Sequence, residues 1–104
     1  MELSGNALDA LGDANRRAIV EILGDQPLSV QQLAERLPIS RPAVSRHLRL
    51  LKQAGLVADE PDGTRRVYHL RAAGVEAIHA YFAEVWGTAA GRFRIVAENT
   101  EPES

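Results

Sequence analysis

Cysteine is absent from this sequence of 104 residues. Its absence excludes disulfide bonds, thiolate metal sites, thiol redox sensing and cysteine nucleophiles. Long apolar runs are also missing, and none approaches the roughly 20 residues that a helix needs to cross a bilayer. The first residues contain neither a basic segment nor an apolar run, so we expect no signal peptide. These absences favour a cytoplasmic protein without a membrane partner.

Aromatic residues make up only 5% of the chain, but its 45% of hydrophobic and 25% of charged residues are typical of one globular domain. The net charge of −2 is unevenly distributed. Residues 40–71 hold seven Lys or Arg and three Asp or Glu, whereas the rest of the chain holds five and eleven. Such segregation indicates a face for a polyanion, although composition alone also allows an ordinary solvated helix face.

Capping residues divide the first half of the chain into helices. Residues 6–24 have the apolar spacing of a helix in two pieces, the second capped by Asp13. Ser29 offers the next N-cap, and Gln32 is placed to complete a capping box for a helix predicted over residues 30–37. A proline directly after this helix ends it.

Another helix, predicted at about residues 41–54, begins after a turn of about three residues, which is the spacing of a helix-turn-helix. At 100° per residue, Val44, Leu48 and Leu51 lie on one side of it, which predicts that this side packs on the core. The opposite side and its flank hold Arg41, Pro42, Ser45, Arg46, Arg49 and Gln53. The basic residues are therefore gathered away from the core side.

From residue 56 the apolar pattern becomes extended. Residues 56–60 and 65–70 read as strands, and the Pro-Asp-Gly-Thr segment at 61–64 supplies a turn. Arg65 and Arg66 directly follow that turn. A helix-turn-helix followed by a basic hairpin is a winged helix. The predicted fold is therefore mainly α with a small β-hairpin, in the order α-α-α-α-β-β-α.

A last helix is predicted over residues 72–97, followed by a frayed acidic tail at 98–104. Its apolar residues recur at helical spacing: Ile78, Phe82, Val85, Trp86, Ala89, Phe93 and Val96. This stripe is wider than one small winged helix needs, so part of it should meet a partner. Gly87 and Gly91 in the same helix favour either close helix approach or a kink, and neutral variation explains them equally well.

The chain from Asp13 to Leu70 resembles the ArsR/SmtB group of bacterial winged-helix transcriptional repressors. The matching segments are RRAIVEIL at 16–23, LAERLPISRPAVSRHLRLLKQAGLV at 33–57 and GTRRVYHL at 63–70. The resemblance implies a single winged-helix domain with its wing at 56–70 that forms a homodimer through the first and last helices, about 3–12 and 72–97. It also implies repression by operator binding and, in many members, release by an inducer.

The helix and wing residues give specific expectations for double-stranded DNA. We expect DNA contacts from Arg41, Pro42, Ala43, Ser45, Arg46, Arg49, Lys52, Arg65 and Arg66. Arg46 and Arg49 would enter the major groove, where arginine pairs bidentately with guanine. Phosphate contacts are expected from the ends of the helix. The wing arginines would touch phosphates or enter the minor groove. The expected dimer contacts are Leu8, Leu11, Ile78, Phe82, Val85, Trp86, Ala89 and Phe93.

Metal sensing is not supported by the sequence. Metal-sensing members of the group typically carry cysteines on the helix before the recognition helix, where this chain has Val30-Gln31-Gln32. Other members place paired histidine and acidic ligands on the last helix, where this chain offers only His79 with Glu76 one turn before it. These two residues are weak candidates, and we expect neither a metal nor a cofactor.

No catalytic constellation is present, so we expect no enzyme activity. Ser45 and His47 are two residues apart on one helix and do not face each other. We interpret His47 as a packing or hydrogen-bonding residue, His69 as a residue near the surface, and the acidic residues of the hairpin as solubilising charges that also shape the wing. The sequence predicts a homodimeric repressor at a pseudo-palindromic operator. Two alternatives stay open: a repressor that responds to a metal or small ligand, and a winged helix that binds proteins instead of DNA.

Overall fold

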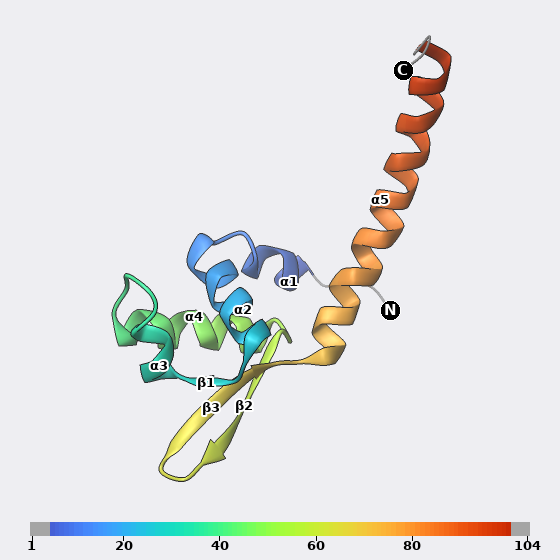
Figure 1. The fold of residues 1–104 in the computed structure, drawn as a ribbon. Helices are drawn as coiled ribbons and strands as arrows, with labels where there is room; N and C mark the ends of the chain where they lie inside the picture. Colours follow the sequence, from blue (N-terminus) through green and yellow to red (C-terminus); the bar gives the residue numbers. More distant parts are fainter. Residues whose placement is uncertain (1–4, 101–104) are drawn as a thin grey trace.

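The structure is a computed structural model that describes the backbone of residues 5–100 and the surroundings of the side chains of residues 7–87. Helices dominate, with one small antiparallel sheet (Figure 1). The elements are α1 (Gly5–Ala10), α2 (Ala14–Asp25), β1 (Leu28–Ser29), α3 (Val30–Ala34), α4 (Arg41–Gln53), β2 (Val57–Asp62), β3 (Arg65–Leu70) and α5 (Ala72–Thr100). The predicted winged helix-turn-helix is confirmed.

Side-chain caps set the starts of the helices, as predicted. Asp13 caps α2 by accepting hydrogen bonds from the backbone N–H groups of Asn15 (2.8 Å) and Arg16 (3.1 Å). Ser29 and Gln32 form the capping box of α3: the Ser29 hydroxyl accepts from the Gln32 N–H at 3.2 Å, and the Gln32 side chain accepts from the Ser29 N–H at 2.9 Å.

The helix predicted over residues 30–37 is too long, because α3 ends at Ala34. The backbone N–H of Arg36 donates to the Leu33 carbonyl three residues back, so the chain tightens into a turn before Pro38. Ser40 then caps α4, accepting from the Ala43 N–H at 3.2 Å. The residues between the two helices therefore form a longer turn than the sequence indicated.

The sheet has three strands in the order β1-β3-β2, whereas the sequence predicted only a hairpin. The additional strand, β1, is two residues long and pairs Leu28 with Tyr68. The hairpin turn is also shorter than the predicted segment 61–64, because Asp62 already pairs with Arg65. The two-residue loop begins at Gly63, whose φ of 68° suits the first position of a type II′ turn.

The core lies between the helices and the sheet, and α4 contributes three of its fully buried side chains. Val44, Leu48 and Leu51 are each 0% exposed, as the helical spacing predicted. His47 is also buried, and its Nδ1 lies 3.3 Å from Nη1 of Arg16 on α2. This contact agrees with the hydrogen-bonding role expected for His47.

Helix α5 projects from the rest of the domain (Figure 1) and runs to Thr100, three residues beyond its predicted end. Its first turns touch the body of the domain, where Ile78 packs against the core. Farther along, Phe82, Val85 and Trp86 are 51%, 47% and 71% exposed. The side chains of Ala89, Phe93 and Val96, and the surroundings of Gly91, lie outside the described residues. None of the helices in the described part of the chain is both long and apolar enough to span a membrane.

Candidate nucleic-acid interface

The outer side of α4 is a row of exposed polar and basic side chains. Six of the residues of α4 that are predicted to contact DNA are exposed: Arg41, Pro42, Ser45, Arg46, Arg49 and Lys52. The seventh, Ala43, is half-buried beside them. The hydrophobic side of the same helix is fixed in the core. The arginine row, formed by Arg41, Arg46 and Arg49, therefore cannot rotate away from solvent without exposing that core. The fold therefore presents this row as a rigid surface.

The two wing arginines lie on opposite faces of the hairpin. Arg65 pairs directly with Asp62 in the strand register, and their charged groups are 3.6 Å apart. The next residue, Arg66, faces the other side, because side chains alternate along a strand. Its guanidinium contacts Asp59, and its side chain is 57% exposed. On this face the wing meets the end of α4.

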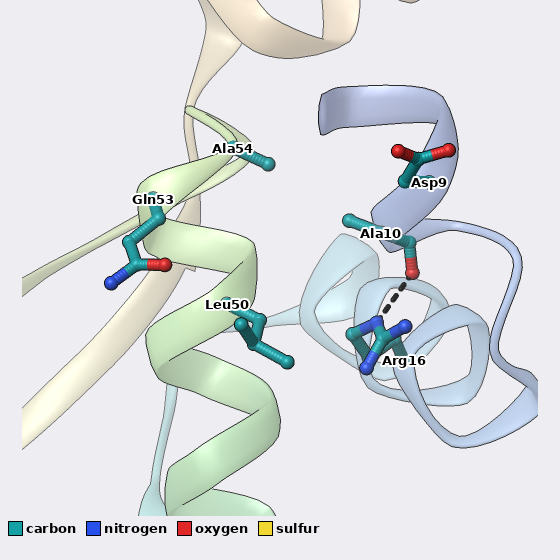
Figure 2. A pocket seen from close by; sticks show the side chains of 6 residues that line it. All are labelled: Asp9, Ala10, Arg16, Leu50, Gln53 and Ala54. Carbon is teal, nitrogen blue, oxygen red and sulfur yellow. Dashed lines mark hydrogen bonds between the residues drawn. The ribbon is translucent and has the colours of Figure 1, made fainter. Parts of the chain in front are cut away.

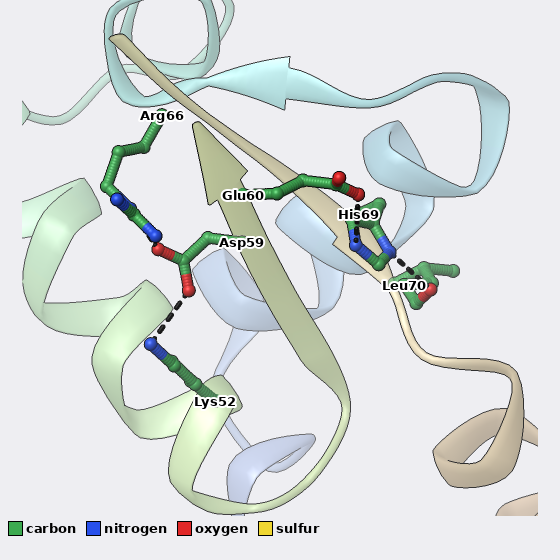
Figure 3. A network of polar contacts seen from close by, with 6 residues as sticks. All are labelled: Lys52, Asp59, Glu60, Arg66, His69 and Leu70. Atoms are coloured by element: carbon green, nitrogen blue, oxygen red, sulfur yellow. Dashed lines mark hydrogen bonds and ion pairs between the residues drawn. The ribbon is translucent and has the colours of Figure 1, made fainter. Parts of the chain in front are cut away.

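Asp59 joins the wing to α4 through two ion pairs (Figure 3). Its carboxylate accepts from Lys52 Nζ at 2.7 Å and from Arg66 Nε at 2.5 Å. These two donors hold the pKa of Asp59 below its usual value, Lys52 having the larger effect. The Asp59 side chain is only 5% exposed, so its expected role as a solubilising charge is wrong, whereas its expected role in shaping the wing agrees with these two ion pairs. The sequence shows the charges but not the strand register that brings them together.

A second acidic residue of the wing has a local partner. The Oε2 atom of Glu60 lies 3.2 Å from Nε2 of His69, across the hairpin (Figure 3). The other ring nitrogen of His69 is 3.1 Å from the Leu70 carbonyl oxygen. The side chain of His69 is 35% exposed, which agrees with its expected position near the surface.

A cleft of about 420 Å³ separates the wing from the starts of α3 and α4. Three cations from two elements line it, namely Arg41 of α4 and the wing residues Arg65 and Arg66. The other lining residues are Ser29, Val30, Gln31, Gln32, Glu35, Thr64 and Tyr68. Cations beside neutral hydrogen-bonding groups suit an anionic backbone, and Glu35 is the one acidic group of the lining.

A smaller hollow of about 210 Å³ lies where α1, α2 and α4 meet (Figure 2). Arg16 lines it, but its Nε donates to the Ala10 carbonyl at 2.6 Å. Another nitrogen of the same guanidinium contacts His47. Arg16 therefore ties α1 and α4 to α2, a structural role that the sequence analysis did not assign.

The expected dimer residues differ in their surroundings. Leu8 and Leu11 on the α1 side are half-buried, and Leu11 packs against the core of its own chain. Phe82 and Trp86 line a mainly apolar hollow of about 410 Å³ together with Ile78, His79 and Ala83. The exposed part of the apolar stripe thus starts at Phe82.

The weak metal candidates His79 and Glu76 are both exposed on α5. Within the described residues, no three His, Cys, Asp or Glu side chains come together in a way that could hold a metal ion. His79 and Glu76 would supply two ligands from one chain, fewer than a stable site uses.

The fold and this surface define a winged helix-turn-helix protein. Residues 11–60 match the family described as a helix-turn-helix domain. The chain is 54% identical over 80 residues to the HTH-type transcriptional regulator Rv2034 of Mycobacterium tuberculosis. The aligned region covers 77% of this chain and 75% of that protein. It is 35% identical to the transcriptional repressor SdpR of Bacillus subtilis, over 62% of this chain and 72% of that one.

Solved structures agree with these relationships. The crystal structure of a possible transcriptional regulator for arsenical resistance superposes with a TM-score of 0.76 at 36% identity, covering 94% of this chain and all of that one. The homodimeric winged helix-turn-helix DNA-binding domain of Mb0332 from Mycobacterium bovis, a possible ArsR-family regulator, has a TM-score of 0.63 at 27% identity, over 82% and 76% of the two chains. The chain belongs to the ArsR/SmtB-type winged helix-turn-helix regulators. This confirms the resemblance found in the sequence.

Proposed function

We propose that this protein is a homodimeric repressor that binds double-stranded DNA at a pseudo-palindromic operator. The observation that supports this most directly is the two-sided construction of α4. Its apolar side is buried at 0% exposure, and its arginine row is exposed beside a basic wing. A helix fixed in this way has the shape and charge to enter a major groove.

The exposed residues have different tasks in this proposal. Arg46 and Arg49 read base edges, because a bidentate arginine–guanine pair discriminates by about 1–3 kcal/mol. Arg41, Lys52, Arg65 and Arg66 contact phosphates and fix the orientation of the domain without reading sequence. Bound in this way, the protein represses by occupying the operator. Its relative SdpR, described as a transcriptional repressor, supports this part of the proposal.

A dimer would place two copies of α4 on one face of the duplex. The exposed apolar residues Phe82, Val85 and Trp86 supply a surface for the second copy, and the related Mb0332 domain is homodimeric. A two-fold axis relates the two recognition helices, so the half-sites should be inverted and about one helical turn apart. The operator would therefore be pseudo-palindromic.

Selection of bound duplexes from a random library, followed by affinity measurements, tests the proposal. Arg46→Ala should relax the sequence preference, whereas Arg66→Ala should weaken binding to all duplexes and reduce the salt slope by about one. Arg17→Ala is the control, since it removes the same charge from an exposed position on α2. If both variants bound operator and random DNA as the parent protein does, α4 would not be the recognition helix.

The same assay separates the remaining alternatives. A winged helix that binds an acidic protein partner would select no duplex and show no salt slope on DNA. A repressor that senses a metal would change its operator affinity between divalent metal and chelator. With two exposed candidate ligands on α5, we expect the affinity to be the same under both conditions.

A further inference from the structure

Three charged residues from three elements form one cluster between the recognition helix and the wing. Lys52 lies in the last turn of α4, Asp59 in β2 and Arg66 in β3. Asp59 pairs with Tyr68, two residues from Arg66, so Asp59 and Arg66 are diagonal neighbours on one face of the hairpin. Lys52 reaches the same carboxylate from α4, as Figure 3 shows.

The exposure of the three side chains is unequal. The Asp59 carboxylate is 5% exposed, whereas the side chains of Lys52 and Arg66 are each 57% exposed. The two cations thus cover the anion, and a phosphate that approaches this surface meets positive charge first. The cluster keeps a net charge of +1, because one carboxylate faces two cations.

The bonds to Asp59 leave most of the donors of both cations available. Arg66 uses its Nε–H, so the N–H groups on its two terminal nitrogens can still donate. Lys52 uses one of its three ammonium protons. Both side chains are long and flexible when unpaired, and ordering them on DNA costs conformational entropy. Asp59 lowers that cost by fixing them before DNA arrives.

We propose that Asp59 is a positioning residue for DNA binding, which holds Lys52 of the recognition helix and Arg66 of the wing in one fixed arrangement for the phosphate backbone. This inference rests on the proposed DNA-binding function. It states that the carboxylate increases DNA affinity even though its own charge repels phosphate. A carboxylate that merely neutralises two cations would have the opposite effect, so the two roles are experimentally distinct.

The structure offers a matched control for the charge. Asp62 is also on β2 and also pairs with a wing arginine, but its side chain is 63% exposed and its partner is Arg65 on the opposite face. Asp59→Asn and Asp62→Asn remove the same charge from the same strand with the same change of side chain. Only the first breaks the connection between the wing and α4.

Fluorescence anisotropy of the full chain with operator and random duplexes, across a salt series, tests the proposal. Asp62→Asn should bind both duplexes as tightly as the parent or more tightly, because the wing becomes more positive. Asp59→Asn should bind both about tenfold more weakly, despite the same gain in charge. Asp59→Glu, which keeps the carboxylate, should recover part of that loss. Binding by Asp59→Asn that is equal to or tighter than that of Asp62→Asn would overturn the proposal.

A double-mutant cycle provides a second measurement if Asp59→Asn does not fold. Independent phosphate contacts would make the losses from Lys52→Ala and Arg66→Ala multiply. Because Asp59 connects the two cations, removing one of them already disturbs the position of the other. The loss of affinity in the double variant should therefore be smaller than the product of the two single losses. Simple multiplication would contradict the proposal. A parent protein that binds neither duplex would instead refute the DNA-binding function itself.

Discussion

The carbonyl oxygen of Gly55 lies in the space that a side chain at Gly74 would occupy. Gly55 ends the turn after α4 with a φ of 81°, and Gly74 lies in the first turn of α5. Between them, the Arg71 N–H donates to the Leu56 carbonyl at 2.9 Å. Backbone atoms thus fix the start of α5 to the end of α4. Helix α5, which carries the apolar stripe, and helix α4, which carries the exposed arginines, are therefore connected through backbone atoms alone.

Gly74→Ala should destabilise the fold, although alanine is the better helix former by about 1 kcal/mol. A Cβ at this position would meet backbone, which cannot move aside as a flexible side chain can. We expect the free energy of unfolding to fall by about 1–3 kcal/mol, the usual effect of forcing extra atoms into a packed site. Urea denaturation monitored by circular dichroism measures it.

Gly24→Ala provides the control for this substitution. Gly24 is also helical, but a Cβ there would make only an ordinary contact, 3.9 Å from the Leu70 side chain. That variant should keep or raise stability by up to about 1 kcal/mol. If the two glycine variants had the same stability, the close approach of α5 to α4 would be disproved.

Ser29→Ala should destabilise α3 and the strand that precedes it. The Ser29 hydroxyl accepts from the Gln32 N–H, and the residue is 5% exposed, so water cannot replace the lost acceptor freely. We expect a loss of about 1 kcal/mol of unfolding free energy, as for other N-cap serines. Ser45→Ala, at an exposed position within α4, should leave the melting temperature unchanged or slightly higher. A similar melting temperature for both variants would argue against the capping box.

The parts of the fold that the sequence predicted depend on local chemistry. The capping box of Ser29 and Gln32 spans three residues, and the core side of α4 follows from the helical period alone. In contrast, β1 is two residues long, and it is a strand only because β3 offers a free edge beside it. No local pattern of Leu28 and Ser29 specifies that pairing.

The same distinction applies to the candidate interface. The arginine row of α4 could be predicted because all its residues lie on one helix. The role of Asp59 could not, since it depends on a register that pairs Asp59 with Tyr68 and on the position of Lys52 in a different element. The steric need for glycine at position 74 arises from Gly55 in the same way. Contacts between elements therefore account for most of what the sequence analysis missed.

Trp86→Asp should convert a dimer into a folded monomer. The side chain is 71% exposed in the single chain, so the substitution does not disturb the core of the protomer. Within a dimer interface, the same change would place a charge among apolar groups, and aromatic anchors commonly contribute 2 kcal/mol or more, about a 30-fold change in affinity. Analytical ultracentrifugation over a concentration series measures the dissociation.

The control for this substitution lies on the other side of α5. Ala80 is exposed and lies about 160° around the helix from Phe82 and about 120° from Trp86, so Ala80→Asp adds the same charge outside the apolar face. This variant should dimerise like the parent. A stable, folded Trp86→Asp dimer would place the interface elsewhere on the molecule.

Acid should weaken the fold through two aspartates. Backbone N–H groups, that of Arg16 first, lower the pKa of Asp13, and Lys52 and Arg66 lower that of Asp59. A carboxyl whose pKa is lower in the folded protein binds its proton more readily when unfolded. The stability it contributes is therefore complete above its usual pKa of 3.8 and is lost as the pH falls through the folded value. We expect the free energy of unfolding to decrease below about pH 4.

Asp13→Asn separates the cap from the charge in this acid response. Asparagine accepts the same backbone hydrogen bonds at an N-cap, so the variant should be about as stable as the parent near pH 7. It has no carboxyl to protonate, so its stability should decline less steeply below pH 4. Asp25→Asn, at the other end of α2, serves as the charge-matched control. Urea denaturation at a series of pH values gives both curves, and an Asp13→Asn curve parallel to that of the parent would show that this cap does not contribute to the acid sensitivity.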